Sequence, residues 1–539
     1  MSSVNPVPVI PTRRSSMPDN RPAEFAGVSF SNKTLLYILF VFKILLPFLI
    51  QDSYYQPHRD EFLYLAEGKH LAWGYMEVPP VLSVFAWLVH LGGGGEFWIK
   101  FWPNLVGGCC WLIVGKTILD FKGQKFALIL GFLPFIFGAY LRVFHLFQPN
   151  FIEIFFWTII GYSMIRFIAT GNIKWLYVFG VSLGLGMLSK YTVAFYIIGL
   201  LGGLLLSNQR KIFLNPHLYG AAAVALIIFL PNFIWQYQHN FPVITHMDEL
   251  KETQLQYNLT GEFITSQFMM NLPAIFVWLA GLIFLIFSSQ GRDFRFYAWA
   301  FFIVVTLMIY FKGKGYYILG IYPLLFAFGA TWLERLTVVK WGWTRYVMLI
   351  FAVTTGLVAI PILLPVAKPD NLVKYYDAIG SYKAGDYKWE DLKAHPLPQD
   401  FADMMGWKEL TKMTARAYAG IPASKKKRTI VIGSSYAFAG ALNYYGPAQG
   451  LPESYSTNAS FLLWLPEKLD FDHMLYVDDD YPRENPIFKQ FEKVTELGKL
   501  NLPMFREDGT RVFFFENATD SLHIILSGYI KTLKGKFER

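Results

Sequence analysis

The sequence has few cysteines and few charged residues for its length. Cys109 and Cys110 are its only cysteines, and they are adjacent within an apolar run, which excludes a disulfide framework and a CxxC metal site. Charged residues make up 16% of the 539 residues, whereas a soluble domain has about 25%. With an apolar share of 54% and a mean hydropathy of +0.33, the composition excludes a disordered chain and an ordinary cytosolic enzyme.

Several short signals are also missing. The chain has no GxGxxG or Walker pattern that would cradle a nucleotide phosphate. Its first 33 residues are polar and lack the apolar core and cleavage site of a signal peptide, so we expect the first span to stay in the chain. The basic run at 425–428 is expected to be a solvated loop, and no nucleic-acid partner is expected.

Long apolar runs recur between residues 34 and 365. Runs of about 17–20 residues cross roughly 30 Å of hydrocarbon, and they must be helical because lipid offers no partners for backbone polar groups. We therefore predict a polytopic α-helical membrane protein with about eleven transmembrane helices. The predicted spans are 34–50, 97–116, 126–142, 151–168, 174–189, 191–207, 218–235, 272–289, 294–311, 316–333 and 345–365.

The distribution of Lys and Arg predicts the orientation. These residues concentrate in the segments that share a side with the N-terminus, as the positive-inside rule requires of cytoplasmic segments. We predict a cytoplasmic N-terminal tail at 1–33 and a transmembrane domain at 34–365 in the cytoplasmic (inner) membrane. An odd number of spans then makes 366–539 extracytoplasmic.

The region after residue 366 has a different composition. Charged residues, Pro and Gly become more frequent, and no further span is found. RTIVIG, HMLYVDDD and RVFFFENA are apolar, β-rich segments that predict strands, and GSSY predicts a tight turn into a helix. We predict a small C-terminal α/β domain outside the membrane.

Ionisable and aromatic residues gather in the predicted outside segments, above all in the first outside loop at 51–96. Ionisable groups at membrane depth are costly and often functional. The alternative is that single residues are interfacial anchors. Within the first loop, Asp60 and Glu61 are adjacent carboxylates of the kind used as general bases, although a surface acidic pair is the simpler interpretation. Pro79 and Pro80 give the end of this loop a rigid corner.

Four stretches together resemble a known family. The first is D-E-x-x-Y followed by G-Y-x-x-x-P-P, and the others are SLGLGMLSKYTVAF at 182–195, NFIWQYQHNFP at 232–242 and KGKGYYILGIYPLLFAFGA at 312–330. In this order they resemble bacterial glycosyltransferases of the family 39-like group, with the GT-C fold, related to protein O-mannosyltransferases and lipid A aminoarabinose transferases. The chain departs from the family pattern at Asn150, where many members carry an acid, and at Gly315, where a histidine is common. The matching positions in the first stretch are Asp60, Glu61, Tyr64, Gly74, Tyr75, Pro79 and Pro80.

The resemblance implies a sugar donor on polyprenyl phosphate in the membrane lipid and an acceptor hydroxyl on a glycolipid, glycan or protein. Asp60 would be the general base, and Glu61 would orient it or contact the acceptor. Cations would bind the leaving phosphate, with Arg142 and Lys190 ranked first and Lys312 next. The further candidates for substrate binding are Arg59, Tyr64, Lys69, Pro79, Pro80, His145, Tyr191, Lys314, Tyr316 and Tyr317.

No cofactor or metal is required by this interpretation. The outside histidines follow no metal-ligand spacing. A polytopic transporter or a flippase of a lipid-linked sugar is the main alternative. Against it, the sequence has no inverted repeat and no matching pair of broken helices.

Overall fold

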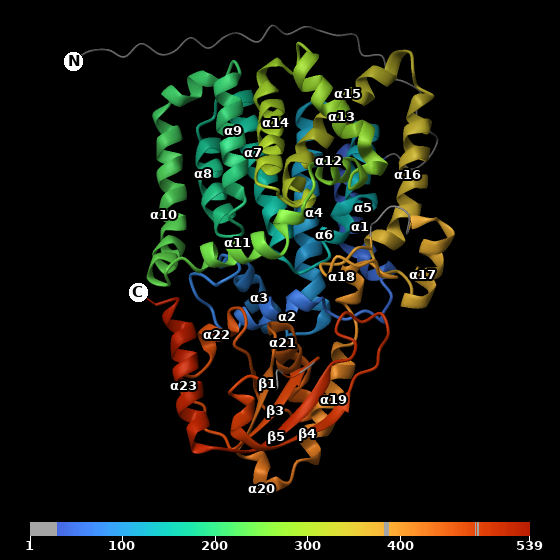
Figure 1. Cartoon of the computed structure of the whole chain (residues 1–539). Coiled ribbons are helices and arrows are strands. Elements are labelled where there is room, and N and C mark those ends of the chain that lie inside the picture. Colours follow the sequence, from blue (N-terminus) through green and yellow to red (C-terminus); the bar gives the residue numbers. More distant parts are fainter. Residues whose placement is uncertain (1–29, 382–386, 480, 482–483, 539) are drawn as a thin grey trace, which may run out of the picture.

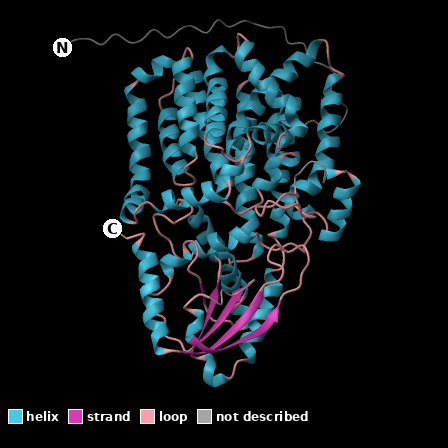
Figure 2. Cartoon of the chain, in the orientation of Figure 1, coloured by secondary structure: helices cyan, strands magenta, loops and turns pink. Residues whose placement is uncertain are grey.

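The computed structural model describes residues 30–381, 387–479, 481 and 484–538. It consists of a bundle of helices with a smaller sheet-containing domain at one end (Figure 1). Among the described residues, the strands all belong to that smaller domain (Figure 2). Of the predicted N-terminal tail, residues 1–29 lie outside the described residues.

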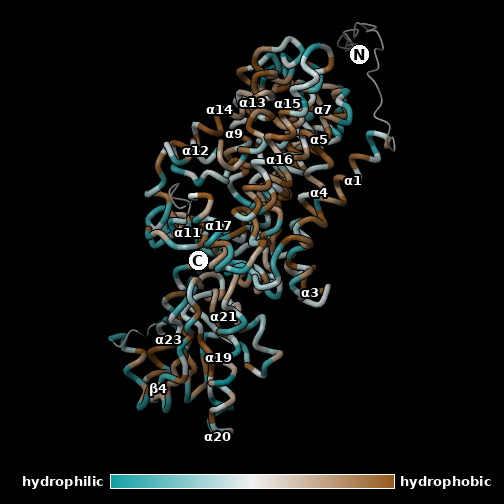
Figure 3. The backbone as a smooth tube through the Cα atoms, turned by 90° about the vertical axis from the view of Figure 1, so that its right-hand side faces the viewer, coloured by the Kyte–Doolittle hydropathy of each residue, from teal (hydrophilic) through white to brown (hydrophobic). Residues whose placement is uncertain are grey.

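A helix overlaps each of the eleven predicted apolar runs. These helices are α1 (Asn32–Ile50), α4 (Glu96–Asp120), α5 (Lys125–Phe137), α7 (Pro149–Thr170), α8 (Lys174–Met187), α9 (Val193–Leu206), α10 (Pro216–Gln238), α13 (Ile275–Phe287), α14 (Arg295–Tyr310), α15 (Tyr322–Val339) and α16 (Thr344–Leu363). Their bounds differ from those of the runs by several residues at α5 and α15. Within the described residues, 7 helices are long and apolar enough to cross a membrane, or up to 8 if a bent pair counts as one span. The total of eleven spans therefore stays a prediction. Hydrophobic residues dominate the bundle, and hydrophilic ones are more frequent toward its ends (Figure 3).

The two ends of the bundle differ in what they contact. At one end, Asn32 donates a hydrogen bond to Gln124, and the Glu334 carboxylate accepts from the backbone N–H of Gln124 and Ala127, which caps the start of α5. At the other end, the N–H of Asp52 bonds to the carbonyl of Pro365. The start of α1 and the sheet domain consequently lie at opposite ends of the bundle, which is the arrangement that an odd number of alternating spans produces (Figure 1).

Glycines allow close packing between spans. A Cβ at Gly329 on α15 would lie 1.8 Å from the carbonyl oxygen of Val277 on α13, and one at Gly203 on α9 would lie 2.1 Å from that of Phe296 on α14. Lipid supplies no hydrophobic drive between helices, so such close backbone contact is a main source of their association.

Shorter helices form the loops of the bundle. They are α2 (Arg59–Glu67), α3 (Val81–Leu91), α6 (Ala139–Val143), α11 (Pro242–Thr253) and α12 (Thr260–Met269), with the 3-10 turns η1 (Arg210–Leu214), η2 (Leu255–Tyr257), η3 (Leu272–Ala274), η4 (Arg292–Phe294) and η5 (Gly315–Ile321). Of these, α2 and α3 belong to the first loop and lie between the bundle and the sheet domain (Figure 1).

The C-terminal domain is α/β, as predicted. Its strands are β1 (Thr429–Gly433), β2 (Ser454–Tyr455), β3 (His473–Asp478), β4 (Phe491–Lys499) and β5 (Arg511–Ala518). The sheet has the order β2-β1-β3-β5-β4, in which β1 pairs in parallel with β2 and β3, while β5 pairs antiparallel with β3 and β4. Its helices and 3-10 turns are α17 (Pro369–Ala378), α18 (Gln399–Ala402), α19 (Trp407–Gly420), α20 (Ala423–Lys426), α21 (Tyr436–Tyr445), η7 (Pro447–Gln449), α22 (Phe461–Trp464), η8 (Phe488–Gln490) and α23 (Asp520–Gly535). The three predicted strands correspond to β1, β3 and β5, although β3 ends at Asp478 and residue 480 lies outside the described residues. The sequence did not indicate β2, which has 2 residues, or β4, which has no fully buried residue.

The C-terminal domain packs directly on α2. The ring of Phe62 lies 5.5 Å from that of Trp407 and 5.7 Å from that of Tyr444, measured between centroids. A Cβ at Gly440 on α21 would lie 2.7 Å from the Cβ of Phe62, so glycine is needed for this approach. The domain thereby fixes the position of the helix that carries the predicted catalytic acids.

Candidate active site

Asp60 lies in the first turn of α2, where the local sequence forms a capping box. The ring of His58 accepts a hydrogen bond from the N–H of Asp60 at 3.2 Å, and the Glu61 carboxylate accepts from the N–H of His58 at 2.8 Å. This position suits a carboxylate, because the first turn of a helix carries partial positive charge.

The carboxylate of Asp60 is held from two sides. The Tyr436 hydroxyl donates to Oδ1 at 2.7 Å, and the Gln148 amide donates to Oδ2 at 3.3 Å. The side chain keeps 31% of its surface exposed. Burial raises the pKa of Asp60, but the fields of His58 and Arg59 and the Tyr436 hydrogen bond together outweigh it, so the pKa is below its usual value. Asp60 is therefore ionised at neutral pH.

Glu61 points into the protein, because neighbouring residues on a helix are separated by about 100°. It is fully buried, and Lys100 on α4 donates to its two oxygens at 2.8 and 2.9 Å. The N–H of Phe147 donates to the same carboxylate at 2.6 Å. Glu61 therefore ties the first loop to α4 and to the segment before α7.

A polar network continues into the bundle beneath Glu61. Asn104 on α4 accepts from Lys43 on α1 at 3.2 Å and contacts the Nδ1 of His145 at 3.0 Å. The other ring nitrogen of His145 bonds to Gln51. Burial, with the charges of Lys100 and Lys43, lowers the pKa of His145 well below its usual value, which keeps this predicted substrate-binding residue neutral.

Lys190 lies in the tight turn between α8 and α9, as predicted. Its ammonium donates to Asn150 at 2.6 Å and forms an ion pair of 3.1 Å with Glu153, both on α7. It also lies 4.4 Å from the centroid of the Tyr317 ring and 5.6 Å from that of Tyr316. Three predicted residues from two distant segments, Lys190, Tyr316 and Tyr317, thus meet at one end of the bundle.

A chain of side-chain hydrogen bonds joins Lys190 to Asp60. Asn150 accepts from Lys190 and donates to the Gln148 carbonyl at 3.4 Å, and the Gln148 amide group donates to Asp60. Asn150, the position where the family often has an acid, is thus a neutral link in this chain. The acid that neutralises Lys190 is Glu153, about one helical turn further along α7.

The corner formed by Pro79 and Pro80 leads into a contact with the turn that carries Lys190. Pro80 precedes α3, and the N–H of Val81 donates to the carbonyl of Leu188 at 3.0 Å. The hydroxyl of Tyr191 donates to Asn232 on α10 at 2.9 Å. Pro79 and Pro80 are buried, so they shape the site rather than contact solvent.

The structure places Arg142 and Lys312 in contact with neither Asp60 nor Lys190. Arg142 donates to the carbonyls of Leu363 and Ile362 at the end of α16 and pairs with Asp400 at 3.0 Å. Lys312 is exposed and donates to the Gln256 carbonyl. The neighbouring Lys314 is the cation of this turn that interacts electrostatically with Asp60. Burial lowers its pKa, and nearby carboxylates partly oppose that shift.

The remaining predicted residues belong to α2 or follow it. Arg59 lies over the Tyr436 ring at 5.2 Å and pairs with Glu507 at 3.7 Å. Tyr64 is buried on the same face of α2 as Asp60. Lys69 is exposed beyond the end of α2 and forms an ion pair with neither of the nearby acids Glu67 and Glu77.

Sequence reasoning missed Tyr436, Gln148, Glu153 and Lys100. Glu153 and Lys100 are charged residues inside apolar runs, a signal that by itself marks a functional or paired group. Tyr436 comes from the C-terminal domain, 376 residues from Asp60, and no local pattern points to it.

In the part of the chain that the structure describes, no group of three or more His, Cys, Asp or Glu side chains could hold a metal ion. The independence from metal and cofactors that the sequence suggested stays a prediction.

Comparisons with known proteins match part of the chain to one protein family and to one curated relative. Residues 77–235 match the sequence profile of the dolichyl-phosphate-mannose-protein mannosyltransferase family. The lipid A galacturonosyltransferase RgtD of Rhizobium johnstonii is 27% identical over 246 residues, which is 43% of this chain and 50% of that protein. The match thus spans about half the length of this curated relative.

Two solved structures share the fold over almost the whole chain. ArnT from Cupriavidus metallidurans bound to undecaprenyl phosphate has a TM-score of 0.58 at 14% identity, over 89% of this chain and 97% of that one. The same protein in the apo state has a TM-score of 0.56 at 14% identity, over 90% and 98%. Residues 77–235 thus carry the sequence signature of the dolichyl-phosphate-mannose-protein mannosyltransferases, within a multi-pass membrane protein that has the GT-C fold.

Proposed function

We propose that this protein transfers a sugar from a polyprenyl-phosphate donor to an acceptor hydroxyl, with Asp60 as the general base. The observation that carries the proposal is the hydrogen-bonded chain from Asp60 through Gln148 and Asn150 to Lys190. It links an ionised acid to a cation at the end of the bundle that adjoins the C-terminal domain. Transfer from a phosphate ester needs these two groups at one site.

The reaction uses the two groups in different ways. The acceptor oxygen forms a bond to the anomeric carbon while the bond from that carbon to the phosphate oxygen breaks. The acceptor proton moves to Asp60, and polyprenyl phosphate leaves as an anion. Because the pKa of Asp60 is low, it accepts the proton late, once the attacking oxygen has become acidic through bond formation.

Lys190 and Lys314 supply positive charge for the leaving phosphate. Lys190 is already neutralised by Glu153, so an incoming phosphate would compete with that carboxylate or share the ammonium with it. Tyr316 and Tyr317 lie beside the same ammonium and form a wall of the site.

The comparisons support the choice of substrates. The bound ligand in the Cupriavidus structure favours undecaprenyl phosphate, or another polyprenyl phosphate, as the leaving group. The name of the Rhizobium relative makes a glycolipid the first acceptor to test. We place the reaction on the extracytoplasmic face of the cytoplasmic membrane, with the N-terminus on the cytoplasmic side, because Lys and Arg favour that orientation.

The test is release of polyprenyl phosphate from a labelled lipid-linked sugar by the purified protein in lipid nanodiscs. Release should require an acceptor and should fall by about 10²–10⁴-fold in Asp60→Asn, the loss expected for a general base. Asp470→Asn is a matched control, because Asp470 is an exposed partner of Arg428 in the C-terminal domain. Movement of intact lipid-linked sugar across the bilayer without release would instead support a flippase, and full activity of Asp60→Asn would exclude its role as base.

A further inference from the structure

A pocket lies on the other side of α2 from Asp60. It has a volume of about 230 Å³ and is enclosed by the end of α2, by α3 and by α21, β2 and α22 of the C-terminal domain. Phe62, Leu65 and Ala66 line it, whereas Asp60, Tyr64 and Glu67 occupy the opposite face of the same helix. A ligand in this pocket would therefore contact the face of α2 that is opposite Asp60, and would not contact the Asp60 carboxylate.

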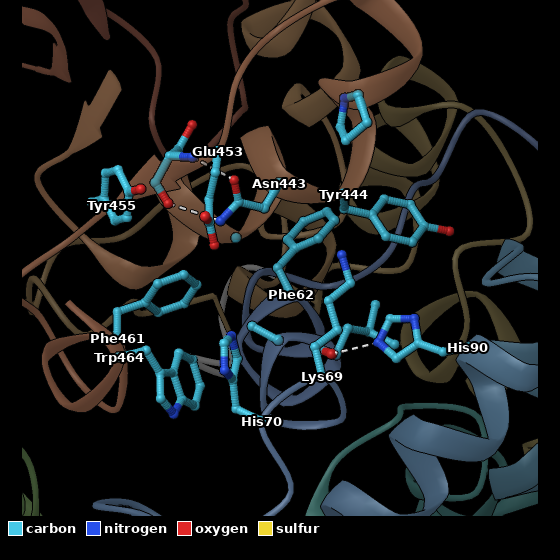
Figure 4. A pocket seen from close by; sticks show the side chains of 15 residues that line it. Phe62, Lys69, His70, His90, Asn443, Tyr444, Glu453, Tyr455, Phe461 and Trp464 are labelled. Carbon is cyan, nitrogen blue, oxygen red and sulfur yellow. Dashed lines mark hydrogen bonds between the residues drawn. The ribbon is translucent and has the colours of Figure 1, made fainter. Parts of the chain in front are cut away.

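Aromatic rings form one wall of the pocket. His70 stacks on Trp464 with 4.3 Å between centroids and 12° between planes, and Phe461 lies 5.3 Å from Trp464. Figure 4 shows these three side chains along one side, with Asn443 and Glu453 across from them. Flat aromatic faces next to polar groups suit a ligand that has both an apolar face and hydrogen-bonding edges.

The polar groups of the pocket can both donate and accept. Lys69 is exposed and makes no side-chain hydrogen bond or ion pair with any described residue, and Glu453 is also exposed. The amide of Asn443 uses one N–H and one lone pair on the backbone of Ser454, at 2.8 and 2.7 Å, which leaves one of each. Neighbouring hydroxyl groups of one ligand could accept from the ammonium and donate to the carboxylate.

The charge of the pocket is balanced. Burial lowers the pKa values of His70 and His90, so both rings are neutral at pH 7. One ammonium and one carboxylate then remain, which disfavours a phosphate or another anion relative to an uncharged ligand. The volume is also below the roughly 300–1,000 Å³ of pockets for drug-sized molecules, and it suits a single ring.

We propose that this pocket is a saccharide-binding site, separate from Asp60, that holds one uncharged sugar ring of a glycan-bearing acceptor. The identification of the bound glycan as the acceptor rests on the proposed function, whereas the binding of a sugar does not. In this role the pocket would hold one sugar ring of the acceptor at a fixed distance from the acceptor hydroxyl that reacts at Asp60, because α2 separates the two sites.

The first test measures binding alone. Methyl glycosides of glucose, galactose and mannose are titrated against the full chain in lipid nanodiscs, without maltoside detergents whose head groups would compete, and binding is followed by saturation-transfer NMR. At least one glycoside should bind, and Asp60→Asn should retain that binding. Lys69→Met and Glu453→Gln should each weaken it by about 3- to 10-fold, the value of one hydrogen bond.

The choice of variants keeps the test clear of folding defects. Lys69 and Glu453 are exposed, so their substitution should leave the unfolding temperature unchanged, whereas Trp464→Ala removes the stacking wall and should abolish binding. The proposal is overturned if no glycoside binds at tens of millimolar, if binding is lost in Asp60→Asn but kept in the pocket variants, or if inorganic phosphate binds in place of the glycosides.

A second measurement connects the pocket to transfer. With a glycan-bearing acceptor, Lys69→Met and Glu453→Gln should raise the acceptor KM and leave kcat unchanged, because the pocket does not touch the reacting atoms. A fall in kcat without a change in KM would contradict the assigned role. If the protein transfers no sugar at all, the proposed function fails, while the glycoside titration still decides whether the pocket binds saccharide.

Discussion

Lys190 can be tested as a phosphate ligand separately from its structural ion pair. In the substitution Lys190→Met, the protein loses the 3.1 Å ion pair with Glu153, the hydrogen bond to Asn150 and the contact with the Tyr317 ring. Only 4% of the Glu153 side chain is exposed, so its charge would stay buried without a cation, with the Thr192 hydroxyl still donating a hydrogen bond to it. We expect a loss of about 3–5 kcal/mol of stability from that charge, with about 0.5–1 kcal/mol more from the cation–π contact.

The double substitution Glu153→Gln/Lys190→Met removes both charges. No uncompensated carboxylate remains, so most of the lost stability should return. If Lys190 binds the leaving phosphate, turnover should nevertheless stay about 10- to 100-fold below that of Glu153→Gln, which keeps the ammonium. The single Glu153→Gln protein is therefore the reference for activity, and wild type is the reference for stability.

The assay has two readouts on the same samples. Thermal unfolding in nanodiscs reports stability, and release of labelled polyprenyl phosphate reports turnover. If the double variant regains both stability and the turnover of Glu153→Gln, Lys190 has a structural role only, and the site needs another cation, for which Lys314 is the candidate.

Three further predictions concern stability. Lys100→Met should destabilise the protein by about 3–5 kcal/mol, because it leaves the fully buried Glu61 without its cation; an unfolding temperature equal to wild type would contradict the ion pair. Burial raises the pKa of Glu77 from 4.5 to about 7, so the folded state binds the carboxyl proton of Glu77 more tightly than the unfolded state does. The resulting stabilisation of the folded state is fully present below about pH 4.5 and is lost as the pH rises through 7. Unfolding temperatures measured from pH 5 to 8 should show this fall, and Glu77→Gln should reduce it; an equal fall in both proteins would assign it to other groups. Gly440→Val should weaken the packing of the C-terminal domain on α2, because the valine side chain would collide with Phe62. Limited proteolysis should then cleave between the bundle and the domain faster than in wild type. An unchanged rate of cleavage would show that α21 can shift without cost.

The positions of the helices were predictable because a span is a local property. An apolar run of sufficient length must be helical in lipid whatever else the chain does, and α1, α7 and α16 follow their runs closely. The strands β1, β3 and β5 were predictable for a similar reason, since their β-branched and aromatic residues are contiguous. The edge strand β4 has mostly polar residues, so its sequence alone does not distinguish it from a loop.

The composition, the order of apolar runs and the D-E-x-x-Y stretch thus determined the class of protein and located the first loop. Only the tertiary structure showed that Asp60 and Glu61 have different partners, because helix geometry directs adjacent side chains to different surroundings. It alone paired Lys190 with Glu153 and brought Tyr436 to Asp60. These contacts join residues from different helices and from two parts of the chain, and a sequence pattern records spacing along one element but not which elements meet in space.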